Sequence, residues 1–214
     1  MDEEIQIINT ATRGEKIRNF FLDNKKKIII ILSIIIVILF SFFFYQDYKA
    51  RQKEALAKEF NQAVILFDNG NRLEILDTMK KVINSNDATY SPLAFFFLLD
   101  NNLIEDNDEI NLYFDIIINQ TGLTQEIKDL NIFKKALFNS EFVEENELLN
   151  ILNPLIKSNS VWKSHALYLM GEYYLSKNQK QKSKEFFEQI VRLENINTKI
   201  QTKAQRRLRA EFSE

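Results

Sequence analysis

Few residues in this chain could carry out catalysis or hold a metal ion. His165 is the only histidine and cysteine is absent, so no histidine-based metal cluster, catalytic triad or thiol nucleophile can be assembled. His165 follows Trp162 in a helical pattern and is interpreted as a packing or capping side chain. The four glycines are too scattered to form a phosphate-binding loop. We therefore expect no enzymatic activity, no cofactor and no small-molecule substrate.

A cluster of carboxylates could suggest a cation site. It comprises Glu105, Asp106, Asp108 and Glu109, but it lacks the glycine and the ligand spacing of a calcium loop. This cluster is interpreted as a solvated turn, and no metal site is predicted.

The charge of the chain is unevenly distributed. The net charge of −2 gives no overall attraction to nucleic acid, so nucleic acid is not expected as a partner. Residues 68–147 hold 16 Asp and Glu against 6 Lys and Arg, a net charge of −10, whereas residues 157–214 hold 6 and 12, a net charge of +6. Such runs are interpreted first as solvated helix faces.

Aromatic residues cluster in two places, in "AFFFLL" at 94–99 and at Tyr173, Tyr174, Phe186 and Phe187. They are expected to lie in the core, as aromatic side chains at helical spacing usually do. If some are exposed, they would line a face suited to a peptide or a partner helix, with the acidic middle of the chain selecting basic sequences.

The stretch from Ile28 to Phe44 carries no charge and only two hydroxyl groups. As a helix it would extend about 26 Å, close to the thickness of a bilayer core once flanking residues reach the interface. A core helix would show a polar side, and a cleaved signal peptide would be followed by small residues, whereas "FSFFFYQDYKARQ" follows here. The stretch predicts an uncleaved transmembrane anchor at 28–45. Ser33, Val37 and Ser41 form its smaller strip, a candidate helix-contact face.

Basic residues predict the orientation of this anchor. Six precede it, including Lys25, Lys26 and Lys27 next to the apolar stretch, and four follow it up to Lys58. Basic residues favour the cytoplasmic side. Residues 1–27 are therefore expected in the cytoplasm and residues 46–214, in a Gram-negative cell, in the periplasm, which makes this a single-pass inner-membrane protein. Because the two sides differ by only two basic residues, the opposite orientation also stays open.

From residue 46 the apolar residues recur every three or four positions, with short polar breaks between. The pattern predicts an all-α domain, and the first of its helices is expected to continue from the anchor. Ser91 and Pro92 predict a helix start, Asn69 and Gly70 a turn, and Pro154 a kink or an end. The helices are expected at 46–68, 72–84, 91–104, 108–118, 124–139, 143–157, 161–177, 179–194 and 198–211.

Helices of this length suggest a repeat near 34 residues, the tetratricopeptide spacing, and residues 161–195 match it best. There Gly171, Tyr174, Ser183, Phe187 and Ile190 occupy positions that pack two helices closely, and Trp162 precedes them. The same frame places Ala63, Leu98 and Ala136 at the Gly171 position, with three of four units carrying a large residue where Ser183 stands. The sequence therefore predicts degenerate tetratricopeptide-like hairpins, closed by the last helix.

The chain also resembles a known family. The basic-flanked span, "YQDYKARQKEALAKEFNQAV", "LNPL", "VWKSHALYLMGEYYL" and "KSKEFFEQI" are similar to bacterial inner-membrane proteins related to the ancillary subunit of the SecYEG translocon. The resemblance covers nearly the whole chain. It implies a periplasmic helical-repeat domain that sits beside the translocon, cooperates with a membrane-anchored chaperone acting on exported proteins, and has no catalytic residue.

The sequence thus leaves three functions open. The leading one is a membrane-anchored protein-binding scaffold at the periplasmic side of the translocon, with translocon subunits, a chaperone and lipid as partners. The others are a cytoplasm-facing repeat receptor and a cell-envelope organiser that assembles with itself. An enzyme would need a carboxylate pair from distant helices.

Overall fold

The computed structural model describes residues 2–194 and 197–212, with side chains described except at residues 2–13 and 17. Every regular element in this part of the chain is an α-helix, which confirms the predicted all-α fold. The helices are α1 (Asp2–Asp68), α2 (Ile75–Ile83), α3 (Tyr90–Asp100), α4 (Asn107–Gln120), α5 (Gln125–Asn139), α6 (Glu145–Ile156), α7 (Lys163–Ser176), α8 (Lys180–Arg192) and α9 (Thr198–Phe212). The chain divides into two compact units, Met1–Ala55 and Leu56–Glu214.

The first unit contains most of α1, including the apolar stretch. The side chains from Ile29 to Phe44 are all exposed, and none is buried against the rest of the chain. Within the described residues, α1 is the one helix long and apolar enough to cross a membrane. So large an exposed apolar surface does not suit a water-soluble core helix, because a core helix buries such side chains. The continuity predicted between the anchor and the following helix is confirmed, since both belong to α1.

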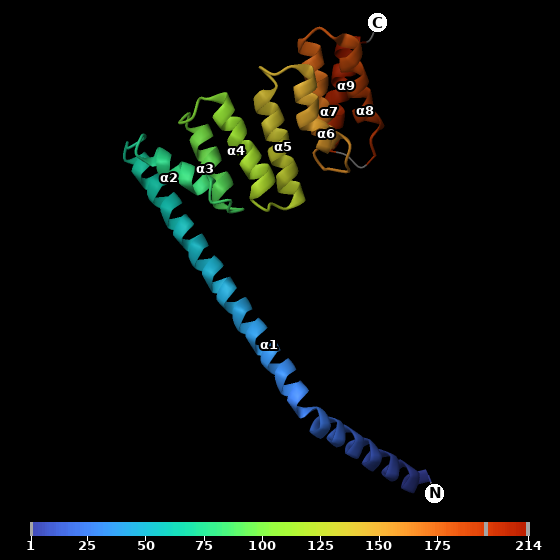
Figure 1. Cartoon of the computed structure of the whole chain (residues 1–214). Coiled ribbons are helices and arrows are strands. Elements are labelled where there is room, and N and C mark those ends of the chain that lie inside the picture. Colours follow the sequence, from blue (N-terminus) through green and yellow to red (C-terminus); the bar gives the residue numbers. More distant parts are fainter. Residues whose placement is uncertain (1, 195–196, 213–214) are drawn as a thin grey trace. The chain divides into compact units, whose positions relative to one another are not determined.

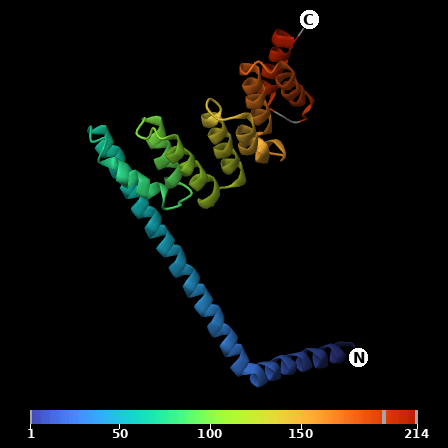
Figure 2. The same cartoon turned by 45° about the horizontal axis from the view of Figure 1, so that its top comes forward.

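The second unit begins at Leu56, rather than at the predicted residue 46, and is built of successive helical hairpins. Figures 1 and 2 show α3 to α9 following one another in chain order, each helix beside the next. In this unit α2 packs closely on α3, α5 on α6 and α7 on α8, and α9 packs on α8 and α7. The end of α1 shares a buried apolar cluster with α2, α3 and α4. Short turns join the helices, so each packs mainly on its sequence neighbours.

The positions of the predicted repeat are buried in every hairpin. They comprise Ala63, Leu98, Ala136 and Gly171, then Ile75, Ile110, Leu148 and Ser183, and finally Met79, Phe114, Leu152 and Phe187. Residues of different size fill equivalent places because each pair of helices adjusts its spacing to the side chains between them. This burial pattern is compatible with a tetratricopeptide-like solenoid.

The predicted start of α3 at Ser91 is wrong. The helix begins at Tyr90, and the Asp87 carboxylate accepts the backbone N–H groups of Thr89 and Tyr90, each at 2.8 Å. Asp87 therefore caps the turn before Ser91, and the backbone N–H of Leu93, which an N-cap at Ser91 would have served, donates instead to the carbonyl of Thr89 at 3.4 Å. Ser91 is instead fully buried and donates its hydroxyl to the carbonyl of Val82 at 3.0 Å. Pro92 is tolerated because it lies in the first turn, where its missing N–H is not needed.

Two other turn predictions have different outcomes. Gly70 has a φ of +91° after the end of α1, as Asn69-Gly70 predicted. Pro154 does not terminate α6 where it stands, since the helix continues to Ile156 and Lys157 donates its backbone N–H to the carbonyl of Asn153. Three further turns place an asparagine at positive φ, at Asn86, Asn102 and Asn178.

Candidate protein-binding groove

The residues predicted to pack the last repeat do pack together. The hydroxyl of Ser183 donates to the carbonyl of Gly171 at 2.8 Å, and a Cβ added to Gly171 would lie 2.6 Å from Cε1 of Phe187. Ile190 is fully buried in the same cluster. Tyr174 is buried and donates its hydroxyl to Glu145, while the ring of Trp162 stacks on Phe133 at 5.5 Å. These residues hold helices together and are not free to bind a ligand.

The predicted helix-contact strip in the apolar stretch is exposed at all three of its residues, Ser33, Val37 and Ser41. The Ser33 hydroxyl donates to the carbonyl of Ile29 at 2.8 Å. This bond satisfies the Ser33 hydroxyl within the helix, so the hydroxyl is not an unpaired donor for a neighbouring helix. What Ser33 contributes to a helix contact is its small size. Lys25, Lys26 and Lys27 are also exposed, but their side of the membrane stays a prediction.

His165 lies among aromatic rings, with ring centroids 5.0 Å from Trp162 and 5.8 Å from Phe133. Burial, and then the positive charge of Lys203, lowers the pKa of its imidazole. Within the described part of the chain, its buried Nδ1 has no hydrogen-bond partner, so no carboxylate accepts from or donates to that nitrogen. Within the described residues, no three His, Cys, Asp or Glu side chains are grouped to hold a metal ion.

The acidic cluster before α4 is only partly a solvated turn. Asp106 caps α4 by accepting the backbone N–H of Asp108 at 3.0 Å. Glu109 instead forms an ion pair with Lys80 at 2.6 Å and accepts a hydrogen bond from Tyr113. The Lys80 hydrogen bond in particular holds the pKa of the Glu109 carboxyl below its usual range. Glu109 therefore joins α4 to α2 and serves the fold.

A groove with an aromatic lining opens between α3 and α5. Its cavity volume is about 410 Å³, within the range of pockets that accept a ligand side chain. Figure 1 shows the helices that form it, α3, α4 and α5, side by side. We call it the α3–α5 groove, and its lining residues are Phe96, Leu99, Asp100, Phe114, Lys134, Leu137, Phe138, Glu141 and Phe142.

The groove combines accessible apolar surface with charge. The side chains of Leu137 and Phe142 are 52% and 48% exposed, high values for such residues. The Lys134 ammonium lies 3.6 Å from the centre of the Phe96 ring, a cation–π contact. The stretch "AFFFLL" is thus not all core: Phe95 and Leu98 are fully buried, as predicted, but Phe96 and Leu99 are half-buried in the groove. Because every residue of this run is apolar, the sequence does not indicate which of its side chains are buried and which line a groove.

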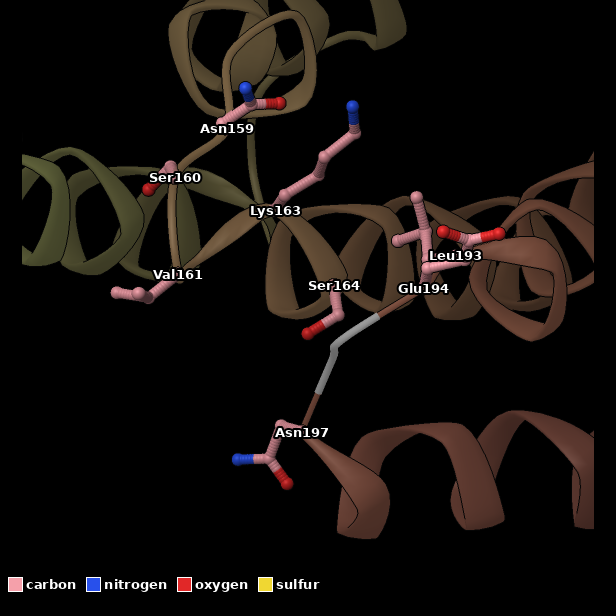
Figure 3. Close-up of a pocket in the computed structure, with 8 residues that line it drawn as sticks. All are labelled: Asn159, Ser160, Val161, Lys163, Ser164, Leu193, Glu194 and Asn197. Carbon is pink, nitrogen blue, oxygen red and sulfur yellow. The ribbon is translucent and has the colours of Figure 1, made fainter.

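Two other cavities lack these properties. One, of about 370 Å³, lies among α4, α5 and α6 and has no aromatic residue in its lining. The other, of about 460 Å³, lies among the α6–α7 turn, the start of α7 and the residues Leu193, Glu194 and Asn197. Figure 3 shows that mostly polar side chains line it, with Lys163 extending away from Asn197. Neither has an aromatic side chain in its lining, and aromatic anchors commonly dominate binding between proteins.

Comparisons with protein-family models, with curated proteins and with solved structures found no match to this chain. The resemblance to translocon-associated proteins therefore rests on the sequence patterns alone.

Proposed function

We propose that this protein is a membrane-anchored scaffold that binds other proteins through its helical-hairpin unit. The observation that carries the proposal is one chain with both an exposed apolar helix of membrane-spanning length and a groove whose lining includes the exposed side chains of Leu137 and Phe142. An apolar helix retains a protein in lipid, and an exposed apolar groove on a repeat unit suits a peptide or a helix of a partner. The scaffold performs no chemistry of its own.

The finer proposal places the unit on the periplasmic side of the inner membrane, beside the protein translocon. Lys25, Lys26 and Lys27 support this orientation by their position next to the span. The resemblance described above supports the translocon and a membrane-anchored chaperone as neighbours. In this location the scaffold would hold newly exported proteins near the channel.

Site-specific photocrosslinking in cells tests the proposal. A photoreactive amino acid at Phe142 should capture exported proteins or a periplasmic chaperone, and one at Val37 should capture translocon subunits. The same amino acid at Leu112, which is 57% exposed on α4 outside the groove, is the control. Capture of cytosolic proteins alone would reject the proposal.

Self-assembly is the second candidate function, and one observation favours it. Residues 68–147 and 157–214 carry opposite net charges, −10 and +6, so two copies could attract one another head to tail. Light scattering of the full chain in detergent distinguishes the scaffold from self-assembly. A single mass at the monomer value favours the scaffold. A mass that increases with protein concentration favours self-assembly.

A further inference from the structure

We infer that the α3–α5 groove binds an extended segment of a partner protein in which a bulky apolar residue lies between lysines or arginines. This inference rests on the proposed function and names the chemistry of the bound partner. Three features of the groove carry it: its apolar anchors, its two carboxylates without a partner, and the ring that already holds a cation.

The apolar part of the groove is preformed. Phe138 contacts Phe142 with ring centroids at 5.2 Å, and it contacts the buried ring of Phe114 at 6.0 Å. Phe114 in turn packs edge-on against Phe95 in the core at 4.8 Å. A side chain entering the groove therefore meets rings that are already held in place, so binding orders few protein groups.

Two carboxylates at the groove select the charge of the partner. Asp100 and Glu141 are both exposed, and neither has an ion pair or a side-chain hydrogen bond within the described residues. Three carboxylates of the acidic middle are ion-paired instead, Glu109 with Lys80, Asp115 with Lys135 and Glu145 with Lys182. Asp100 and Glu141 are therefore available to cations on a partner, and the net charge of −10 over residues 68–147 attracts such a segment at longer range.

The Phe96 ring indicates where a cation can sit. Its face accepts the Lys134 ammonium at 3.6 Å, so the ring presents its negative face toward the groove. A lysine or arginine of the partner would compete with Lys134 for this face. Removing Lys134 should therefore tighten the binding of a basic segment, whereas an acidic segment would bind more weakly.

The test uses the full chain in nanodiscs of phosphatidylcholine, which carries no net charge, and fluorescence anisotropy of three labelled peptides. The peptides are the basic GSKRFLRKSG, the neutral GSQNFLNQSG and the acidic GSEDFLDESG, with empty nanodiscs as blank. We expect the basic peptide to bind at least about tenfold more tightly than the acidic one, and less tightly as salt increases.

Matched variants assign this binding to the groove. Phe142→Ala and the double variant Asp100→Asn with Glu141→Gln should each weaken the basic peptide by about fivefold or more, and Lys134→Met should tighten it by about twofold. The controls lie outside the groove: Asp77→Asn with Glu147→Gln and Lys128→Met repeat the same changes, and Leu112→Ala truncates another exposed apolar side chain. These should stay within about twofold of the wild type.

Equal binding of the three peptides, or equal effects of groove variants and controls, would overturn the inference. Photocrosslinking separates this result from failure of the proposed function. If Leu112 and not Phe142 captures exported proteins, the scaffold function stands and its site lies elsewhere. If neither position captures them, both proposals fail.

Discussion

Gly171 is a residue at which the packing of α7 on α8 leaves no room for a side chain. A methyl group there would lie within 3.0 Å of three atoms of the Phe187 ring, which is fully buried and cannot swing aside. Gly171→Ala should therefore lower the free energy of unfolding by about 1 to 3 kcal/mol, as overpacking commonly does. Chemical denaturation followed by circular dichroism measures the change.

Two further variants test the cause of this loss. Gly14→Ala should have no such effect, because nothing lies within 4 Å of the added atom. Phe187→Leu should recover part of the loss when it is combined with Gly171→Ala, because the two residues are in contact. Strict additivity of the two substitutions would argue against a clash.

Glu145 joins three helices through its carboxylate. The Lys182 ammonium donates to both of its oxygens at 2.9 Å, and the Tyr174 hydroxyl donates to Oε1. These contacts, Lys182 foremost, hold the pKa of the Glu145 carboxyl below its ordinary value of 4.5. A carboxyl whose pKa is lowered by folding stabilises the fold above pH 4.5, and this contribution is lost as pH falls through the folded pKa.

The expected behaviour of Glu145→Gln follows from the lowered pKa of the Glu145 carboxyl. At pH 7 its melting temperature should lie below that of the wild type, with a free energy loss of no more than about 1 kcal/mol because the pair is partly exposed. The two melting temperatures should converge as pH is lowered to about 3. Glu147→Gln, an exposed neighbour on α6, is the control, and a difference independent of pH would refute the assignment.

The closing helix α9 adds an ion pair to its buried apolar contacts with α7 and α8. Arg207 donates to both carboxylate oxygens of Glu172 on α7, at 2.7 and 2.8 Å. Arg207→Met should speed hydrogen exchange of the amides of residues 198–212 by about tenfold, because a bidentate ion pair of this kind stabilises more than a single exposed contact. Mass spectrometry measures the exchange.

Arg206→Met is the matched control for this prediction. Arg206 is exposed on the same helix, so its loss should leave the exchange unchanged. Equal acceleration by both variants would mean that loss of charge, and not the Glu172 contact, governs the opening of α9.

The elements themselves were largely predictable, and the exceptions have identifiable causes. Apolar residues at intervals of three and four located the helices of the second unit, because one face of each must be buried. The start of α3 was missed because Asp87, three residues before Tyr90, accepts the backbone N–H of Tyr90, and the helix begins there, one residue before Ser91. Glu109 was placed in a turn because its partner, Lys80, is distant in sequence. The groove was not predictable, since it depends on which residues of α3 and α5 come together in space.

The orientation of the whole molecule is open to a direct test. In the wild type, a reporter that is active only after export should be active when fused after Glu214, because six basic residues precede the span and four follow it. Replacing Lys25, Lys26 and Lys27 with glutamine leaves three before the span, and reporter activity should fall by about two- to fivefold.

Replacing three lysines after the span instead, Lys49, Lys53 and Lys58, is the control and should leave the orientation unchanged. A wild-type fusion that is active only with a cytoplasmic reporter would favour the cytoplasm-facing receptor.

The asparagines at positive φ have a consequence for the unfolded chain. Asn86, Asn102 and Asn178 each occupy a turn conformation that glycine fills more often. Asparagine tolerates this conformation through its short polar side chain, yet it leaves the denatured chain fewer accessible states than glycine would. Each of these turns thus forms with a smaller loss of conformational entropy than the same turn with glycine would. A chain of 214 residues with only four glycines is therefore well suited to a fold made of many short turns.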